Sequence, residues 1–141
     1  MQTTDITAFV DGIVHEPTQA EGPGVDLTVT EIYEITTPGR VDFGGGELES
    51  ADSEPHPSAK RNPGDDYEWW TLDAGRYLVE YNQSLTGDAT VTLQTRRELL
   101  ERGVSHPTIH VESLPQVPLS VGGTGVKIKQ NARVSTIVDA D

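Results

Sequence analysis

Residues 25–35, VDLTVTEIYEI, alternate apolar and polar side chains. An alternation with a period of two is typical of a β-strand that buries one face. The alternation slips once, which predicts a β-bulge near Glu31. Shorter β-branched and aromatic runs follow, at 76–81, 89–95, 108–114, 117–121, 126–129 and 133–138. Short strands at this spacing predict an all-β fold, either a sandwich or a closed barrel.

The rest of the chain predicts one short helix and two loops. Residues 97–102, RELLER, have a helical composition. Thr95 and Glu98 are spaced as in a capping box, which would fix the start of that helix. Residues 44–66 are rich in Gly, Pro, Ser and acidic side chains, which predicts a long acidic loop with the composition of a flexible segment. Residues 15–23 form the second predicted loop. The length fits one domain, 1–141.

The charge balance excludes several classes of function. The chain has 23 acidic and 10 basic residues, a formal net charge of −13 at pH 7, and no cysteine. Such a surface repels nucleic-acid backbones, so we expect no nucleic-acid partner. Concentrated salt relieves the self-repulsion because the Debye length falls to about 3 Å at 1 M. With no apolar run of roughly 18 residues and no signal peptide, we expect no membrane partner and a cytoplasmic protein, in a cytoplasm rich in salt.

Several segments occur in an order that resembles a known family. They are GVDLTV (24–29), VDFGGGELE (41–49), WWTLDAGRYLVEYNQ (69–83), TRRELLERG (95–103) and KQNARVSTIV (129–138). Together they resemble the dUTPase and dCTP deaminase family, particularly its archaeal members. The resemblance implies a distorted β-barrel or jelly roll of the dUTPase-like type, a homotrimer with sites between subunits, and pyrimidine deoxynucleoside triphosphates as ligands. It also implies Mg²⁺ carried on the substrate phosphates.

Candidate site residues follow from the matched motifs. Asp26 stands at the acid of the first motif; its alternative role is a local turn contact at the start of a strand. Arg96 matches the arginine of the second motif, and Arg97 and Glu98 replace the two serines that follow it in the family. Arg96 and Arg97 are candidates for phosphate binding. Their alternative role is a solvated Arg/Glu helix start or salt bridges between subunits. The carboxylate of Glu98 would oppose a triphosphate, although it stabilises a helix start.

The third and fourth motifs depart from the family. The resemblance implies a catalytic Asp or Glu beyond the helix, where this chain has HPTIHVESLPQVPLSVGG (106–123). Ser120 falls near the position of the deaminase glutamate, and Glu112 is the only carboxylate between residues 103 and 139. Thr136 replaces the glutamine of the fourth motif. Glu98 and Glu112 therefore remain weak catalytic candidates, and loss of a general base typically costs about 10²–10⁴-fold in rate.

Two other groups of side chains are of types that could bind a metal or a base. His106, His110 and Glu112 are metal-capable types at even spacing, but residues i and i+4 of a strand lie about 13 Å apart, too far for one metal. We therefore predict no protein-held metal. Trp69 and Trp70 precede a strand, and alternation would place one in the core and the other at an interface or edge. Stacking of a tryptophan on a base is the less favoured alternative.

The sequence thus favours a protein that binds pyrimidine deoxynucleoside triphosphates with impaired or lost catalysis. One alternative is an active dUTP diphosphatase or dCTP deaminase with substitute residues. The other is a non-catalytic structural or interaction trimer.

Overall fold

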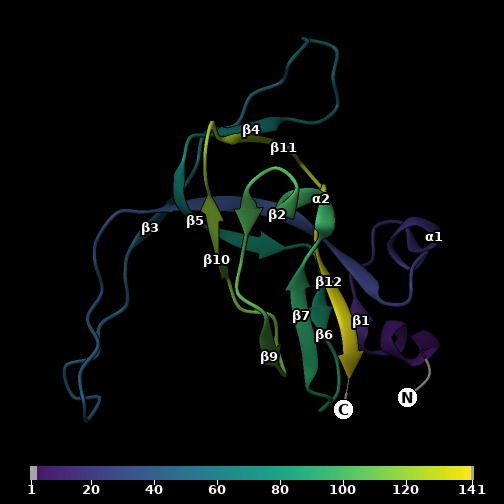
Figure 1. Ribbon diagram of the computed structural model, residues 1–141, viewed down its shortest axis with the longest axis horizontal. Coiled ribbons are helices and arrows are strands. Elements are labelled where there is room, and N and C mark those ends of the chain that lie inside the picture. The colour runs from purple at the N-terminus through teal and green to yellow at the C-terminus, as the bar shows by residue number, and fades with distance from the viewer. Residues whose placement is uncertain (1–2, 141) are drawn as a thin grey trace.

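The alternating residues form one long strand, β2 (Val25–Ile35), in the computed structural model, which describes residues 3–140. The first half of β2 pairs with β12 (Arg133–Ala140), and its second half pairs with β5 (Gly75–Tyr81). The register shifts between Val29 and Glu31, which confirms the predicted bulge. Because a bulge increases strand twist, β2 crosses from one half of the curled sheet to the other (Figure 1).

The main sheet has eight antiparallel strands curled into a half-barrel. Its order is β8 (Val104–Ser105), β10 (Val117–Val121), β5, β2, β12, β7 (Val91–Thr95) and β9 (Ile109–Val111), and β3 (Ser53–Pro55) pairs with the end of β2. Two smaller pairs are β1 (Val10–Asp11) with β6 (Ser84–Leu85), and β4 (Trp69–Leu72) with β11 (Val126–Lys129). Strands make up 43% of the chain and helices 9%, which confirms the all-β class.

The predicted helix exists, but its predicted cap is wrong. Helix α2 (Arg97–Leu100) ends two residues before the predicted boundary, and its N-cap is Arg96, without a side-chain cap. The Thr95 hydroxyl instead donates to the carbonyl oxygen of His106 and accepts the His106 N–H, both at 2.9 Å. A residue between β8 and β9 therefore takes the hydroxyl that a capping box would need.

Two further helical segments were not predicted from the sequence. A 3₁₀ helix, η1 (Thr3–Phe9), begins the described chain, and α1 (Glu16–Gln19) lies inside the predicted 15–23 loop. The buried Gln19 side chain accepts the N–H groups of Val14 and His15 and donates to the carbonyl oxygen of Asp26. These bonds fasten the segment to the start of β2. No helix among residues 3–140 is long and apolar enough to cross a membrane.

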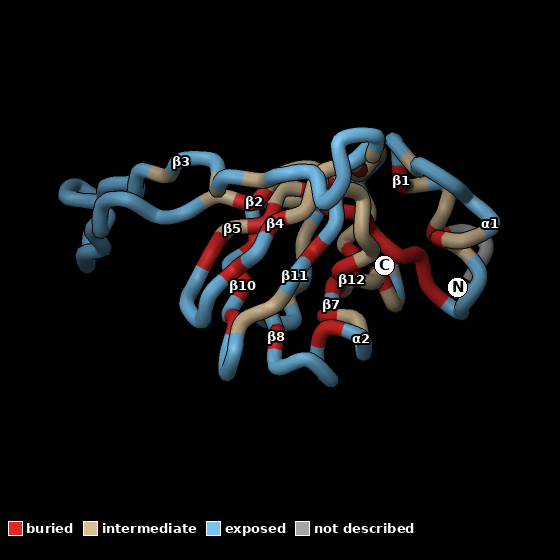
Figure 2. Tube along the Cα trace, turned by 90° about the horizontal axis from the view of Figure 1, so that it is seen from above, coloured by how far each residue is buried: buried red, intermediate tan, exposed pale blue. Residues whose placement is uncertain are grey.

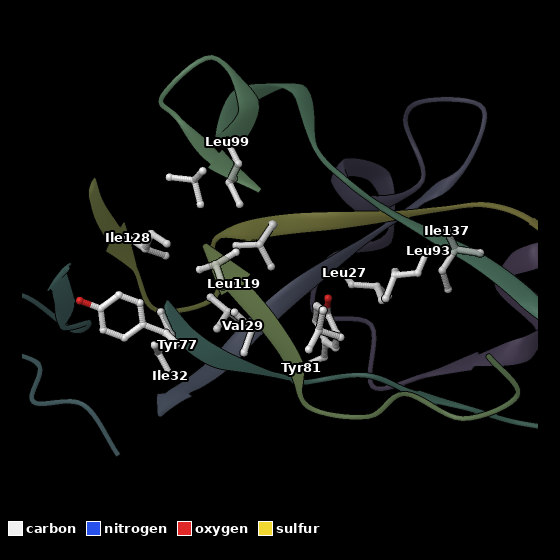
Figure 3. Packing of buried hydrophobic residues seen from close by; sticks show 14 of the residues in the cluster. Leu27, Val29, Ile32, Tyr77, Tyr81, Leu93, Leu99, Leu119, Ile128 and Ile137 are labelled. Atoms are coloured by element: carbon white, nitrogen blue, oxygen red, sulfur yellow. The ribbon is translucent and has the colours of Figure 1, made fainter. Parts of the chain in front are cut away.

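The core fills the concave side of the curled sheet. Figure 3 shows side chains from β2, β5, β7, β10, β11, β12 and α2 packed together, with Leu27 and Val29 of β2 among the labelled residues. Trp70 is 1% exposed and belongs to the core, whereas Trp69 is half-buried, as the alternation predicted. The indole Nε1 of Trp70 is the one buried side-chain donor or acceptor in the described residues that lacks a hydrogen-bond partner.

Residues 36–52 form a projecting hairpin, which we call the arm. It continues the β2–β3 pairing away from the body, and it is pale blue along nearly all its length in Figure 2. Backbone bonds join Arg40 to Glu49 at 2.7 and 2.9 Å, and the Asp42 carboxylate accepts the N–H groups of Gly45 and Glu47, both at 2.9 Å. The arm belongs partly to the predicted 44–66 loop, which is exposed as expected and contains β3.

Candidate functional site

The sheet order brings together residues that are far apart in the sequence. Asp26 in β2, Thr136 in β12 and Gln94 in β7 lie opposite one another across three neighbouring strands. Helix α2 begins just beyond this row, so residues 96–98 lie against it. A cleft with a volume of 380 Å³ opens between these elements and residues 21–24. Its lining includes Asp26, Arg96, Arg97 and Glu98, four of the five residues predicted from sequence.

Asp26 is the centre of a partly buried ion-pair network. One carboxylate oxygen accepts the Thr136 hydroxyl at 2.7 Å. The other accepts an N–H of Arg133 at 2.9 Å and lies 3.6 Å from Nε of Arg96. The side chains of Asp26, Arg96 and Arg133 are 12%, 15% and 25% exposed. Both oxygens of Asp26 are therefore engaged within the protein, which leaves the carboxylate poorly placed to deprotonate a water molecule.

The charges around the cleft are nearly balanced. Glu98 lies 3.1 Å from Nη2 of Arg96, and Arg133 also binds Glu21 at 2.9 Å. A hydrogen bond from its own backbone N–H and the charge of Arg96 lower the pKa of Glu98, so this carboxylate is a weakened base. Arg97 is the exception, because it lines the cleft and has no carboxylate partner among residues 3–140.

Known proteins resemble this chain in structure only. No protein-family model matches the sequence, and no curated protein does. Among solved structures, the 2'-deoxycytidine 5'-triphosphate deaminase from Agrobacterium tumefaciens superposes with a TM-score of 0.64 at 12% identity, over 97% of this chain and 46% of that one. The chain has a dUTPase-like fold. It spans about half the length of the deaminase it matches.

The dUTPase-like fold separates the fifth predicted residue from the others. Glu112 follows β9 and is exposed, and it does not line the cleft. Ser120 lies on β10, also exposed and also outside the cleft. Thr136, at the position of the family's glutamine, is the hydroxyl that binds Asp26. The cleft therefore holds Asp26 and Glu98 as its predicted carboxylates, and both are paired with arginine.

Two members of the network, Arg133 and Glu21, have no role predicted from the sequence. Arg133 could have been found from the sequence, because Ala132-Arg133 matches the start of the fourth motif. In the structure, β12 places Arg133 beside Asp26. Glu21 could not have been found in this way, since it lies in a segment predicted as a plain loop. Its position depends on α1 and on the buried Gln19 amide, which are tertiary features.

The histidines do not assemble a metal site. His106 is buried, and its Nε2 lies 2.7 Å from the Ser135 hydroxyl, which also lies 2.6 Å from the Tyr81 hydroxyl. His110 is exposed and bonds Thr92 at 2.9 Å. Within residues 3–140, no group of three His, Cys, Asp or Glu side chains could hold a metal ion. His106 instead belongs to a buried polar chain.

The charged residues that line this cleft distinguish it from a larger cavity nearby. A cavity of 560 Å³ lies beside η1 and α1 and shares residues 22–24 with the cleft. Its lining has Glu16 as its charged side chain and no arginine or lysine among the described residues. An anionic ligand would gain nothing there, so the smaller cleft is the candidate site.

Proposed function

We propose that this protein binds a pyrimidine deoxynucleoside triphosphate in the cleft beside Asp26 and turns it over slowly or not at all. The observation that carries the proposal is Arg97, an unpaired arginine on the first turn of α2 that faces the cleft of a dUTPase-like fold. Arginine binds phosphate oxygens through two parallel hydrogen bonds and remains charged at any working pH.

The networks around the cleft support binding rather than catalysis. Hydrolysis or deamination needs a carboxylate free to take a proton from water. The oxygens of Asp26 are held by Thr136, Arg133 and Arg96, and Glu98 is paired with Arg96. Carboxylate oxygens that already accept hydrogen bonds from the protein are not oriented toward a water molecule. Turnover would therefore need this network to open.

Magnesium fits the proposal only as part of the ligand. The cleft carboxylates are paired with arginines, so none is free to coordinate a cation directly. Phosphate oxygens are themselves suitable Mg²⁺ ligands, and the ion would lower the charge that the ligand brings to a very acidic protein. The chain's own residues would then position the phosphates through Arg97.

The test is ligand-dependent stability in molar KCl with Mg²⁺. Thermal unfolding should shift upward with dUTP or dCTP, because a ligand at 100 times its Kd adds about 2.7 kcal/mol. Arg97→Gln should weaken binding by roughly tenfold or more, since a hydrogen bond to a charged group contributes about 1.5–3 kcal/mol. Arg40→Gln is the matched control, because Arg40 lies in the arm and pairs with Glu49.

Three outcomes would contradict the proposal. A folded protein that none of the nucleotides stabilises does not bind them. Equal stabilisation by inorganic triphosphate would show that the nucleoside is not recognised. Release of dUMP from dUTP, or of dUTP from dCTP, at enzymic rates above a heat-killed control would show that a general base operates.

A further inference from the structure

The arm presents large apolar side chains to solvent on a defined backbone. Phe43, Val41 and Leu48 are 109%, 89% and 64% exposed. Single exposed apolar residues are common, but a group of them marks an interaction site. The Asp42 carboxylate holds the tip through two backbone N–H groups, so the tip has a specified shape. The arm is therefore built to display Phe43 rather than to hide it.

A second feature, which we call the basic pocket, lies between β4, β11, α2 and the start of β12. It has a volume of 290 Å³ and an apolar floor. The floor includes Trp69, Leu99, Val126 and Ala132. A residue such as phenylalanine buries about 150–250 Å² in a site of this kind.

The rim of the basic pocket concentrates unpaired cations. Arg102, Lys127 and Lys129 line it, and none of them has a carboxylate partner among residues 3–140. The lining also contains Arg133 and Glu98, which are already paired with Glu21 and Arg96. Arg61 adds a further cation, with its guanidinium carbon 4.5 Å from the centre of the Trp69 ring. These four unpaired cations are four of the ten basic residues of the chain. Their grouping indicates an acidic occupant.

We propose that the arm of one molecule docks into the basic pocket of a second copy, with Phe43 on the apolar floor and the arm's carboxylates against the cationic rim. The arm carries four carboxylates and a single arginine, so its charge complements that of the rim. Its combination of an aromatic side chain with flanking acids also matches an apolar floor inside a basic rim. A small polar anion would match the rim alone.

The occupant is a second copy because both halves of the contact lie on every chain. In Figures 1 and 2 the arm projects away from the body, on the side away from α2, so it does not reach its own pocket. A contact between two different surfaces leaves one free pocket on the first copy and one free arm on the second. Such contacts either close into a ring or extend into a chain.

The test uses the full chain in molar KCl, with sedimentation velocity over a dilution series. The wild-type chain should associate. Phe43→Ser should raise the dissociation constant by about tenfold or more, because a central aromatic anchor carries much of an interface. Lys127→Glu combined with Lys129→Glu should do the same. Val14→Ser is the matched control, because Val14 is exposed but lies outside the arm and the basic pocket.

Mixing the two variants distinguishes docking from misfolding. The Phe43→Ser protein keeps an intact pocket, and the double lysine variant keeps an intact arm. At a concentration between the wild-type dissociation constant and the raised one, each variant alone should be monomeric and the mixture should form a heterodimer. Unchanged association of Phe43→Ser, or no complex on mixing, would overturn the proposal. So would a monomeric wild-type chain that inorganic triphosphate stabilises through Lys127 and Lys129, because the pocket would then be a small-anion site.

Discussion

Replacing Asp26 by asparagine should destabilise the fold through the two arginines that it neutralises. Asparagine keeps the shape and an acceptor for the Thr136 hydroxyl, so the change isolates the charge. Removing one partner of a buried ion pair costs about 3–5 kcal/mol. Arg96 retains Glu98 at 3.1 Å, and Arg133 retains Glu21 at 2.9 Å. We therefore expect the free energy of unfolding to fall by about 3 kcal/mol, the lower end of that range.

For a chain of this length that loss corresponds to about 10 °C in Tm. The assay is urea unfolding in molar KCl, followed by the fluorescence of the two tryptophans. The deficit should persist in molar salt, because a buried pair is screened much less than an exposed one. Glu49→Gln is the control, since Arg40 and Glu49 are 64% and 61% exposed and such pairs contribute under about 1 kcal/mol. If Asp26→Asn loses no more than this control, the network does not stabilise the fold.

Three further changes test the interior. Ser135→Ala should cost about 2–4 kcal/mol, because it strands a buried tyrosine hydroxyl and the imidazole of His106; an unchanged urea midpoint would contradict this. Burial lowers the pKa of His106, so the unfolded chain binds a proton more readily and stability should fall as pH drops below about 6.5. His106→Gln should flatten that profile and His110→Gln should not. A methyl group at Gly24 would overlap a main-chain carbonyl of β12, whereas Gly44 faces open space; Gly24→Ala should therefore unfold at much lower urea than Gly44→Ala.

The sequence predicts the strands well because local pattern determines them. The period of two in residues 25–35 fixes both the bounds of β2 and its bulge. Alternation likewise predicts that one of Trp69 and Trp70 is in the core, and the structure shows that it is Trp70. In these segments, the burial or exposure of each side chain follows from its position in the alternation, because each strand buries one face.

Local pattern fails where distant residues compete for the same group. Thr95 has the spacing of a helix cap, but His106 takes its hydroxyl. Helix α1 depends on the buried Gln19 amide, which no local pattern reveals. At the cleft, motif position located Asp26, Arg96, Arg97 and Glu98, while the pairing that engages both oxygens of Asp26 emerged only from the fold.

The Asp26 network also bears on how motifs in such chains should be interpreted. Asp26 and Arg96 join β2, β12 and the start of α2, so selection for folding alone would preserve them in a lineage that no longer turned over nucleotides. Arg97 forms no ion pair with a carboxylate among the described residues. The paired residues at this cleft therefore stabilise the fold, and the unpaired Arg97 beside them is the position at which a substitution would change ligand binding without breaking an ion pair.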